Sequence, residues 1–262
     1  MTEYKVVFLD IDGTILRPDD TIENTTKNAI AQLQAKGIEV VLATGRPLHE
    51  ILEIGEELSI TSFIAYNGAF AIHKGDTIYK EPMSAELVEE LLHIARENDH
   101  QVVLYTKETN VFTTIESAIV KDFIKTFHLK QNKILEEHFQ EDVLGATIIT
   151  NAEDIDSKYR HLTNIHLSQV NVEGMKSCRD VIRDKVNKGV AVEAFLTRAG
   201  YSSDNAIAFG DGMNDKEMLS FVGTGFAMGN AHPDLPRYAK YTTTDVEHSG
   251  VYNGLKSIGL ID

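Results

Sequence analysis

The most informative segment of the sequence is Val6-Val7-Phe8-Leu9-Asp10-Ile11-Asp12-Gly13-Thr14. Its apolar half does not alternate with polar residues, which is typical of a strand buried on both faces of a sheet. The carboxylates of Asp10 and Asp12 follow where this strand runs out into a Gly-Thr turn. Like charges this close raise each other's proton affinity unless a cation lies between them, and Mg2+ prefers hard carboxylate and carbonyl ligands. The segment therefore predicts a reaction centre, where Asp10 could attack an electrophile while Asp12 handles a proton.

Alternating strands and helices follow this segment and return near the end of the chain. In the first third we expect helices over residues 25–36 and 49–58, and strands over residues 38–43 and 63–66. After Lys188 we expect helices over residues 189–199 and 216–221, and strands over residues 206–209 and 225–228. Strand, crossover helix and strand in this order predict a parallel sheet.

The middle of the chain has a different pattern. Residues 71–79 are typical of a hairpin around Lys74-Gly75-Asp76. From there to about Val186 we expect helices over residues 85–97 and 119–127 and strands over residues 102–105, 110–114, 146–150, 167–172 and 177–182. Adjacent strands with helices on one side indicate an α+β module. The predicted fold is therefore α/β: a doubly wound, Rossmann-like parallel-sheet core (residues 1–83 and 187–262) with an inserted α+β domain (residues 84–186).

Composition excludes several classes of protein. The 262 residues are 42% hydrophobic and 25% charged, which is ordinary for a soluble globular protein. The net charge of -15 would repel a phosphate backbone, so we expect no nucleic-acid partner. Cys178 is the lone cysteine and can form neither a disulfide framework nor a thiolate metal cluster. There is no 18-residue apolar stretch and no signal-peptide pattern at the start, so we expect a cytoplasmic protein with no membrane partner. Oligomeric state is not indicated.

Three further patches could belong to the same site. Thr44-Gly45-Arg46 ends the second strand, and its hydroxyl and backbone N–H groups could hold phosphate oxygens. Lys188 opens a helix, where a positive charge opposes the helix dipole. Gly210-Asp211-Gly212-Met213-Asn214-Asp215 follows another apolar strand, at the sheet edge where doubly wound folds bind ligands. Taken singly, the first could be a structural turn, the second a solvated surface lysine and the third a helix cap.

Together the four patches supply a nucleophile, an acid/base, carboxylates for a metal and positive charge for a transferring phosphoryl group. Competing motifs fail on spacing. The chain has no G-x-x-x-x-G-K-[ST] sequence, and the glycine of Asp10-Ile11-Asp12-Gly13 comes too early for a calcium loop.

In this order the motifs resemble those of the haloacid dehalogenase superfamily, specifically its Cof-type phosphatases with a large C2B cap. The resemblance spans the whole chain, including the insertion of roughly a hundred residues between the second and third motifs. Asn67-Gly68-Ala69 and Asn230-Ala231 are also similar to that branch. The core would then be the phosphatase domain and residues 84–186 the cap, whose residues would set specificity.

The resemblance implies a role for each motif residue. Asp10 would be the nucleophile that forms an aspartyl-phosphate, and Asp12 would protonate the leaving alcohol and then activate water. Lys188 would neutralise Asp10 and the phosphate. Mg2+ would be the cofactor, and Asp215 would support its ligands from outside. The metal would be held by Asp10, the Asp12 backbone carbonyl, Asp211 and Gly212; the phosphate would be bound by Ile11, Thr44, Gly45, Lys188 and Asn214.

The expected function is Mg2+-dependent hydrolysis of small phosphomonoesters, such as sugar phosphates or phosphorylated cofactors. Two alternatives stay open: a phosphohexomutase of the same superfamily, and a non-catalytic metabolite-binding regulator built on this scaffold. In each case the partner would be a small phosphorylated metabolite.

Overall fold

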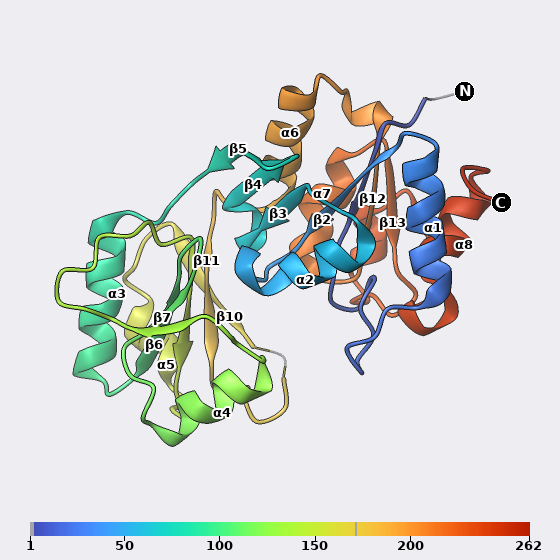
Figure 1. Ribbon diagram of the computed structural model, residues 1–262. Coiled ribbons are helices and arrows are strands. Elements are labelled where there is room, and N and C mark those ends of the chain that lie inside the picture. Colours follow the sequence, from blue (N-terminus) through green and yellow to red (C-terminus); the bar gives the residue numbers. More distant parts are fainter. Residues whose placement is uncertain (1–2, 171) are drawn as a thin grey trace. The chain divides into compact units, whose positions relative to one another are not determined.

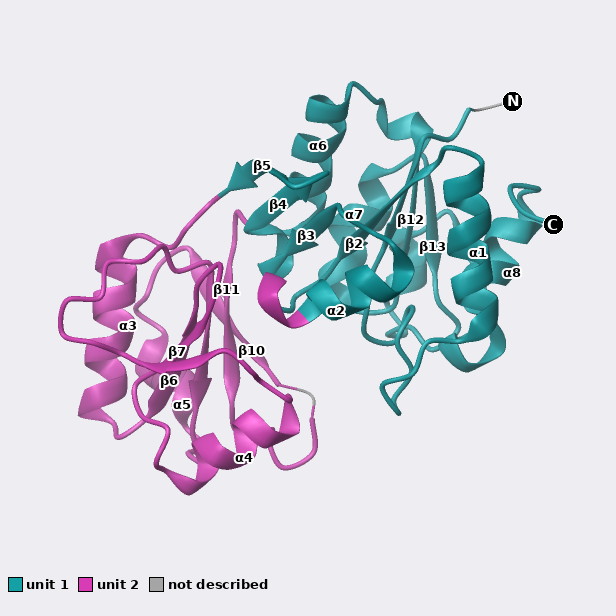
Figure 2. Ribbon diagram, in the orientation of Figure 1, with its two compact units in different colours: residues 1–46, 51–80, 187–262 teal, residues 47–50, 81–186 magenta. Residues whose placement is uncertain are grey.

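The computed structural model describes residues 3–170 and 172–262 (Figure 1). It divides into two compact units, shown in different colours in Figure 2. Unit 1 comprises Met1–Arg46, Ile51–Lys80 and Asn187–Asp262, and unit 2 comprises Pro47–Glu50 and Glu81–Val186. The chain thus leaves unit 1 after Lys80 and returns to it at Asn187.

Unit 1 is built on an eight-stranded sheet in the order β14-β13-β12-β1-β2-β3-β4-β5. The central strand β1 pairs in parallel with both β12 and β2, so that Val6 lies opposite Ala206 on one side and Glu39 on the other. Only the hairpin of β4 and β5 runs antiparallel to its neighbours. The strands are β1 (Val6–Leu9), β2 (Glu39–Ala43), β3 (Phe63–Ala65), β4 (Phe70–His73), β5 (Asp76–Lys80), β12 (Ala206–Gly210), β13 (Thr224–Ala227) and β14 (Tyr241–Thr242). The predicted α/β class with a parallel core is confirmed.

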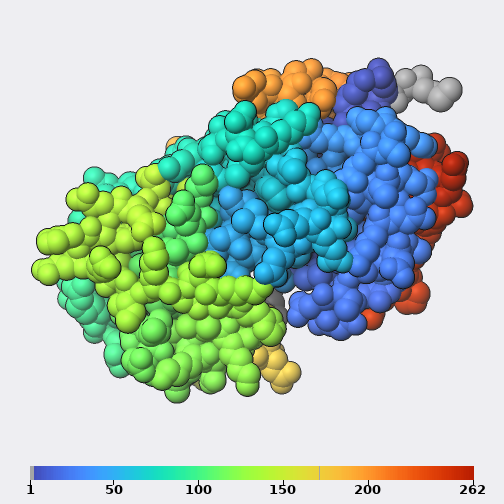
Figure 3. Space-filling view, in the orientation of Figure 1, coloured from blue at the N-terminus to red at the C-terminus, as the bar shows by residue number. Residues whose placement is uncertain are grey.

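Helices cover the sheet of unit 1. They are α1 (Asn24–Ala35), α2 (Leu48–Leu58), α6 (Lys188–Ala199), α7 (Lys216–Phe221) and α8 (Gly250–Ser257). Val6 and Phe8 of β1 belong to one buried cluster with Phe195 of α6 and Met218 of α7, and Phe8 meets Phe195 edge to face with ring centroids 5.4 Å apart. Helix α1 packs against β2 and α8, while its outward residues are open to solvent (Figure 3).

Parallel strands place their carboxyl ends at one edge of the sheet. β1, β2 and β12 end at Leu9, Ala43 and Gly210. The chain therefore delivers Asp10, Thr44 and Asp211 to the same edge.

Unit 2 contains a six-stranded sheet in the order β10-β11-β9-β6-β7-β8, antiparallel except for the pairing of β7 with β8. Its strands are β6 (Gln101–Tyr105), β7 (Asn110–Phe112), β8 (Asn132–Ile134), β9 (Gly145–Ile149), β10 (Ile165–Gln169) and β11 (Arg179–Arg183). Its helices are α3 (Ala85–Glu97), α4 (Ala118–Thr126) and α5 (Ile155–Tyr159).

The expectation of helices on one side of this sheet is wrong. Val102 and Leu104 of β6 pack with residues of α3 and α5, whereas Val103 between them packs with Val120 and Phe123 of α4. Successive residues of a strand point to opposite faces, so helices cover both faces. Because the apolar residues of β6 are consecutive, they lie on both faces of the sheet, and each face has to be covered by a helix.

Most element boundaries differ from prediction by one or two residues. β3 ends at Ala65, because Tyr66 begins a short 3-10 helix, η1 (Tyr66–Gly68). The strand expected over residues 167–172 is β10, which starts earlier, at Ile165; residue 171 lies outside the described residues. β8, β14, α5 and α8 were not predicted. None of the described helices is long and apolar enough to cross a membrane.

Candidate active site

Lys188 is the centre of the charged network in unit 1. Its side chain is 0% exposed, and Nζ donates to Asp10 Oδ1 at 2.6 Å and to Asp215 Oδ1 at 2.6 Å. Burial alone would lower the pKa of this lysine, but the two carboxylates raise it above its ordinary value. Lys188 is therefore a fixed positive charge, and the reading of this residue as a solvated surface lysine is wrong.

Both carboxylate oxygens of Asp215 accept hydrogen bonds from other groups of the protein. Its Oδ1 accepts from Lys188, and its Oδ2 accepts from the backbone N–H groups of Asp211 and Gly212, each at 3.0 Å. The residue is 0% exposed. With both oxygens engaged, Asp215 is built to hold the Asp211–Gly212 turn and the lysine in place.

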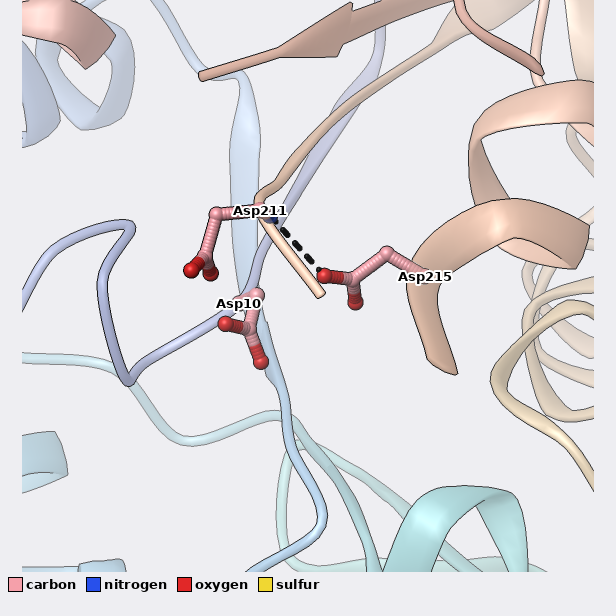
Figure 4. Close-up of side chains that lie close together, drawn as sticks. All are labelled: Asp10, Asp211 and Asp215. Carbon is pink, nitrogen blue, oxygen red and sulfur yellow. Dashed lines mark hydrogen bonds between the residues drawn. The ribbon is translucent and has the colours of Figure 1, made fainter. Parts of the chain in front are cut away.

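The carboxylates of Asp10, Asp211 and Asp215 lie close together (Figure 4). Oxygens of Asp10, Asp211 and Asp215 lie within 4.8 Å of one another. Burial and then the charge of Asp215 raise the pKa of Asp10 well above its usual range, although Lys188 opposes this. The same two causes raise the pKa of Asp211 to about 6. The site concentrates more negative charge than one lysine offsets.

These residues fit a divalent cation of the Mg2+ type. Crowded carboxylates with raised pKa values are the groups that a bound cation would keep ionised. Asp211 is also oriented by protein donors, since Thr14 Oγ1 donates to its Oδ1 at 3.2 Å and Asn230 Nδ2 lies 3.5 Å from its Oδ2. Asp10 and Asp211 are the two carboxylates that could bind the ion directly.

Asp12 is not part of this carboxylate cluster. Its side chain is 53% exposed and is held by Arg46, whose Nε donates to Oδ2 at 2.9 Å and whose Nη2 donates to Oδ1 at 2.5 Å. Two parallel bonds of this kind fix a carboxylate in orientation as well as in place. To donate a proton to a leaving group, Asp12 must exchange one of these bonds.

Three of the residues expected to bind phosphate follow strands that end at the same edge of the sheet: Ile11 follows β1, Thr44 follows β2 and Asn214 follows β12. Ile11 is fully buried, and its carbonyl accepts from Leu16 N at 2.8 Å, which closes the turn after β1. Thr44 is 1% exposed, and its Oγ1 accepts from Arg46 N at 3.1 Å. Asn214 donates through Nδ2 to Asn67 Oδ1 at 2.9 Å.

The structure thus brings Asp10, Lys188, Asp211, Gly212 and Asp215 into one bonded network. The side chain of Asp12 is outside it, and the roles assigned from the sequence stay predictions. Sequence reasoning gave no role to Arg46 or Asn67, nor to the orienting groups of Thr14 and Asn230. A signal for Asn67 was present, because it follows β3 at the edge where β1 and β2 also end.

The comparisons with known proteins agree with this geometry. The haloacid dehalogenase-like hydrolase family matches residues 7–255. A Bacillus subtilis (strain 168) protein named "Putative phosphatase YkrA" is 31% identical over 259 residues, covering 99% of both chains. The 5-amino-6-(5-phospho-D-ribitylamino)uracil phosphatase YitU of the same organism is 29% identical, covering 97% of both. A solved structure from Geobacillus kaustophilus HTA426 is 30% identical with a TM-score of 0.91, covering 98% of this chain and 100% of that one. The chain therefore belongs to the haloacid dehalogenase-like hydrolases and is an enzyme of their phosphatase type.

Proposed function

We propose that this protein is a Mg2+-dependent phosphatase that hydrolyses small phosphomonoesters through an aspartyl-phosphate on Asp10. The observation that carries the proposal is the buried Lys188, bonded at 2.6 Å to both Asp10 and Asp215. It fixes a positive charge beside one oxygen of Asp10 and leaves the other oxygen as the attacking atom.

In the first step Asp10 Oδ2 attacks phosphorus, and the bond from phosphorus to the leaving alcohol oxygen breaks. Asp12 gives its proton to that oxygen. In the second step Asp12 takes a proton from water, whose oxygen attacks phosphorus and releases Asp10 and inorganic phosphate. Lys188 offsets the negative charge throughout.

Bound Mg2+ would supply further positive charge at the transferring phosphoryl group. We assign it to Asp10, the Asp12 backbone carbonyl, Asp211 and Gly212. We assign phosphate contacts to Ile11, Thr44, Gly45, Lys188 and Asn214, with Asp215 supporting both groups. We further propose that the core is residues 1–83 and 187–262 and that residues 84–186 form the specificity-setting cap.

The names of relatives support a small phosphorylated substrate. YitU is named for a phosphoribitylamino compound, and a Cronobacter sakazakii relative, 27% identical over 232 residues, is named HMP-PP phosphatase. Sugar phosphates and phosphorylated cofactors are therefore the classes that we assign to this chain.

The direct test is phosphate release from p-nitrophenyl phosphate and from a panel of some dozens of metabolites, each assayed with Mg2+ and with EDTA. We expect turnover that EDTA stops and Mg2+ restores. Hexose 1-phosphates in the panel separate hydrolysis, which yields free sugar, from mutase activity, which yields an isomeric sugar phosphate. Tight binding of a metabolite without any turnover would instead identify a regulator.

A further inference from the structure

The turn Tyr66–Gly68 has an unusual backbone. Its three residues all have positive φ, at 54° for Tyr66, 54° for Asn67 and 96° for Gly68. Tyr66 is 5% exposed, and a bulky buried residue in the left-handed region is an outlier that the surrounding structure must enforce. Strained backbone residues of this kind cluster at active sites and ligand-binding segments.

The surroundings that enforce this turn are the segments that we assign to phosphate binding. Tyr66 N donates to Arg46 O and Asn67 N donates to Thr44 O, each at 3.1 Å. On the other side, a Cβ added to Gly68 would lie 2.2 Å from the carbonyl oxygen of Asn187, the residue before Lys188. The turn is thus wedged between the Thr44 loop and the start of α6.

The side chain of Asn67 connects this turn to a third segment. Its Oδ1 accepts from Asn214 Nδ2 at 2.9 Å. It also lies over Gly45, where an added Cβ would come within 2.9 Å of Oδ1. An amide nitrogen has two N–H groups, so the bond to Asn67 uses one and leaves the other with a fixed direction.

We propose that Asn67 is a positioning residue that orients the Asn214 amide for the phosphoryl group. Asn67 Oδ1 holds one N–H of Asn214, and the second N–H of Asn214 then donates to a phosphoryl oxygen. The inference rests on the proposed function in assigning a phosphoryl group to this site. Asparagine suits the position because it adopts the left-handed backbone more readily than most residues.

The test is a double-mutant cycle read out by binding of inorganic phosphate, with calorimetry in the presence of Mg2+. Asn67→Gly removes the amide while glycine keeps the left-handed backbone. A hydrogen bond to a charged group is worth roughly 10-fold or more in affinity, so we expect Asn67→Gly and Asn214→Ala each to weaken phosphate binding by about 10-fold. Because one acts through the other, the double variant should bind no more weakly than Asn214→Ala alone.

The matched control is Asn164→Gly, which makes the same change at a second left-handed asparagine (φ 63°), an exposed one in unit 2. It should leave phosphate binding unchanged, and a melting curve checks that each variant is folded. Effects that multiply in the double variant would overturn the inference, as would an Asn67→Gly protein that binds phosphate like the parent.

Turnover of p-nitrophenyl phosphate separates this inference from the proposed function. If the parent protein binds phosphate but hydrolyses nothing, the proposed function fails while the cycle still decides the role of Asn67. If the parent is active and the cycle shows no coupling, only the inference fails. A parent that binds no phosphate overturns the inference, and one that also hydrolyses nothing overturns the proposed function as well.

Discussion

Replacing Lys188 by methionine should lower the free energy of unfolding, because the structure buries the two carboxylates that this lysine neutralises. Methionine fills much of the same volume but removes the ammonium group that is bonded to Asp10 and Asp215. Those two carboxylates, 5% and 0% exposed, would then be buried without their cation. Removing one partner of a buried ion pair costs about 3–5 kcal/mol. We therefore expect the free energy of unfolding to fall by about this amount.

The assay is urea unfolding followed by circular dichroism at pH 7 in EDTA. Thermal melting gives a second readout. For a domain of this size a loss of about 1 kcal/mol lowers the melting temperature by roughly 2–4 °C, so we expect it to fall by roughly 6–20 °C. Lys27→Met is the matched control, because Lys27 pairs with Glu57 at the surface, where both side chains are over a third exposed. Exposed pairs contribute about 0–1 kcal/mol.

Added Mg2+ should recover part of the loss in Lys188→Met, because a divalent cation would again offset the carboxylates. A Lys188→Met protein that unfolds at the same urea concentration as the parent would refute the reasoning. It would mean that the buried lysine and its two carboxylates do not depend on one another in solution.

Three further changes test other parts of the structure. Asp10→Asn should lower kcat on p-nitrophenyl phosphate by at least about 10³-fold, since it removes the attacking oxygen, while the melting curve stays cooperative; normal turnover by this variant would remove Asp10 as nucleophile. Gly68→Ala would place Cβ 2.2 Å from Asn187 O and add about 1–2 kcal/mol of left-handed strain, so we expect weaker phosphate binding and a lower urea midpoint, and unchanged values would contradict the wedged turn. Burial raises the pKa of Asp180 above its usual range, although the Thr147 hydroxyl donates to it at 2.6 Å. A raised folded-state pKa gives stability that is present below the unfolded pKa and is lost as pH rises through the folded pKa, so Asp180→Asn should raise the urea midpoint at pH 7 and lose that advantage near pH 4; an equal effect at both pH values would contradict the assignment.

The sequence predicted the core of unit 1 well because its signals are local. The apolar runs of β1 and β12 each end in acidic residues, and such a run needs only its own residues to be recognised. The order of strands and helices then places those ends together without knowledge of any contact.

Other features depended on residues far apart in the chain. The burial of Lys188 follows from partners 178 and 27 positions away, and a single lysine at a helix start gives no sign of them. The strand expected to reach Tyr66 ends at Ala65 because hydrogen bonds from Tyr66 and Asn67 to the Thr44 loop impose a left-handed turn. In unit 2, β8 has only three residues and a polar pattern, too short for periodicity to decide.

The place of β1 in the middle of its sheet has a consequence for synthesis on the ribosome. One neighbour, β2, follows within the first 43 residues, but the other, β12, starts at Ala206. All strands of unit 2 lie between residues 101 and 183, so they leave the exit tunnel earlier. The nascent chain therefore keeps the acidic turn after β1 without its bond to Lys188 until every strand of unit 2 has been made.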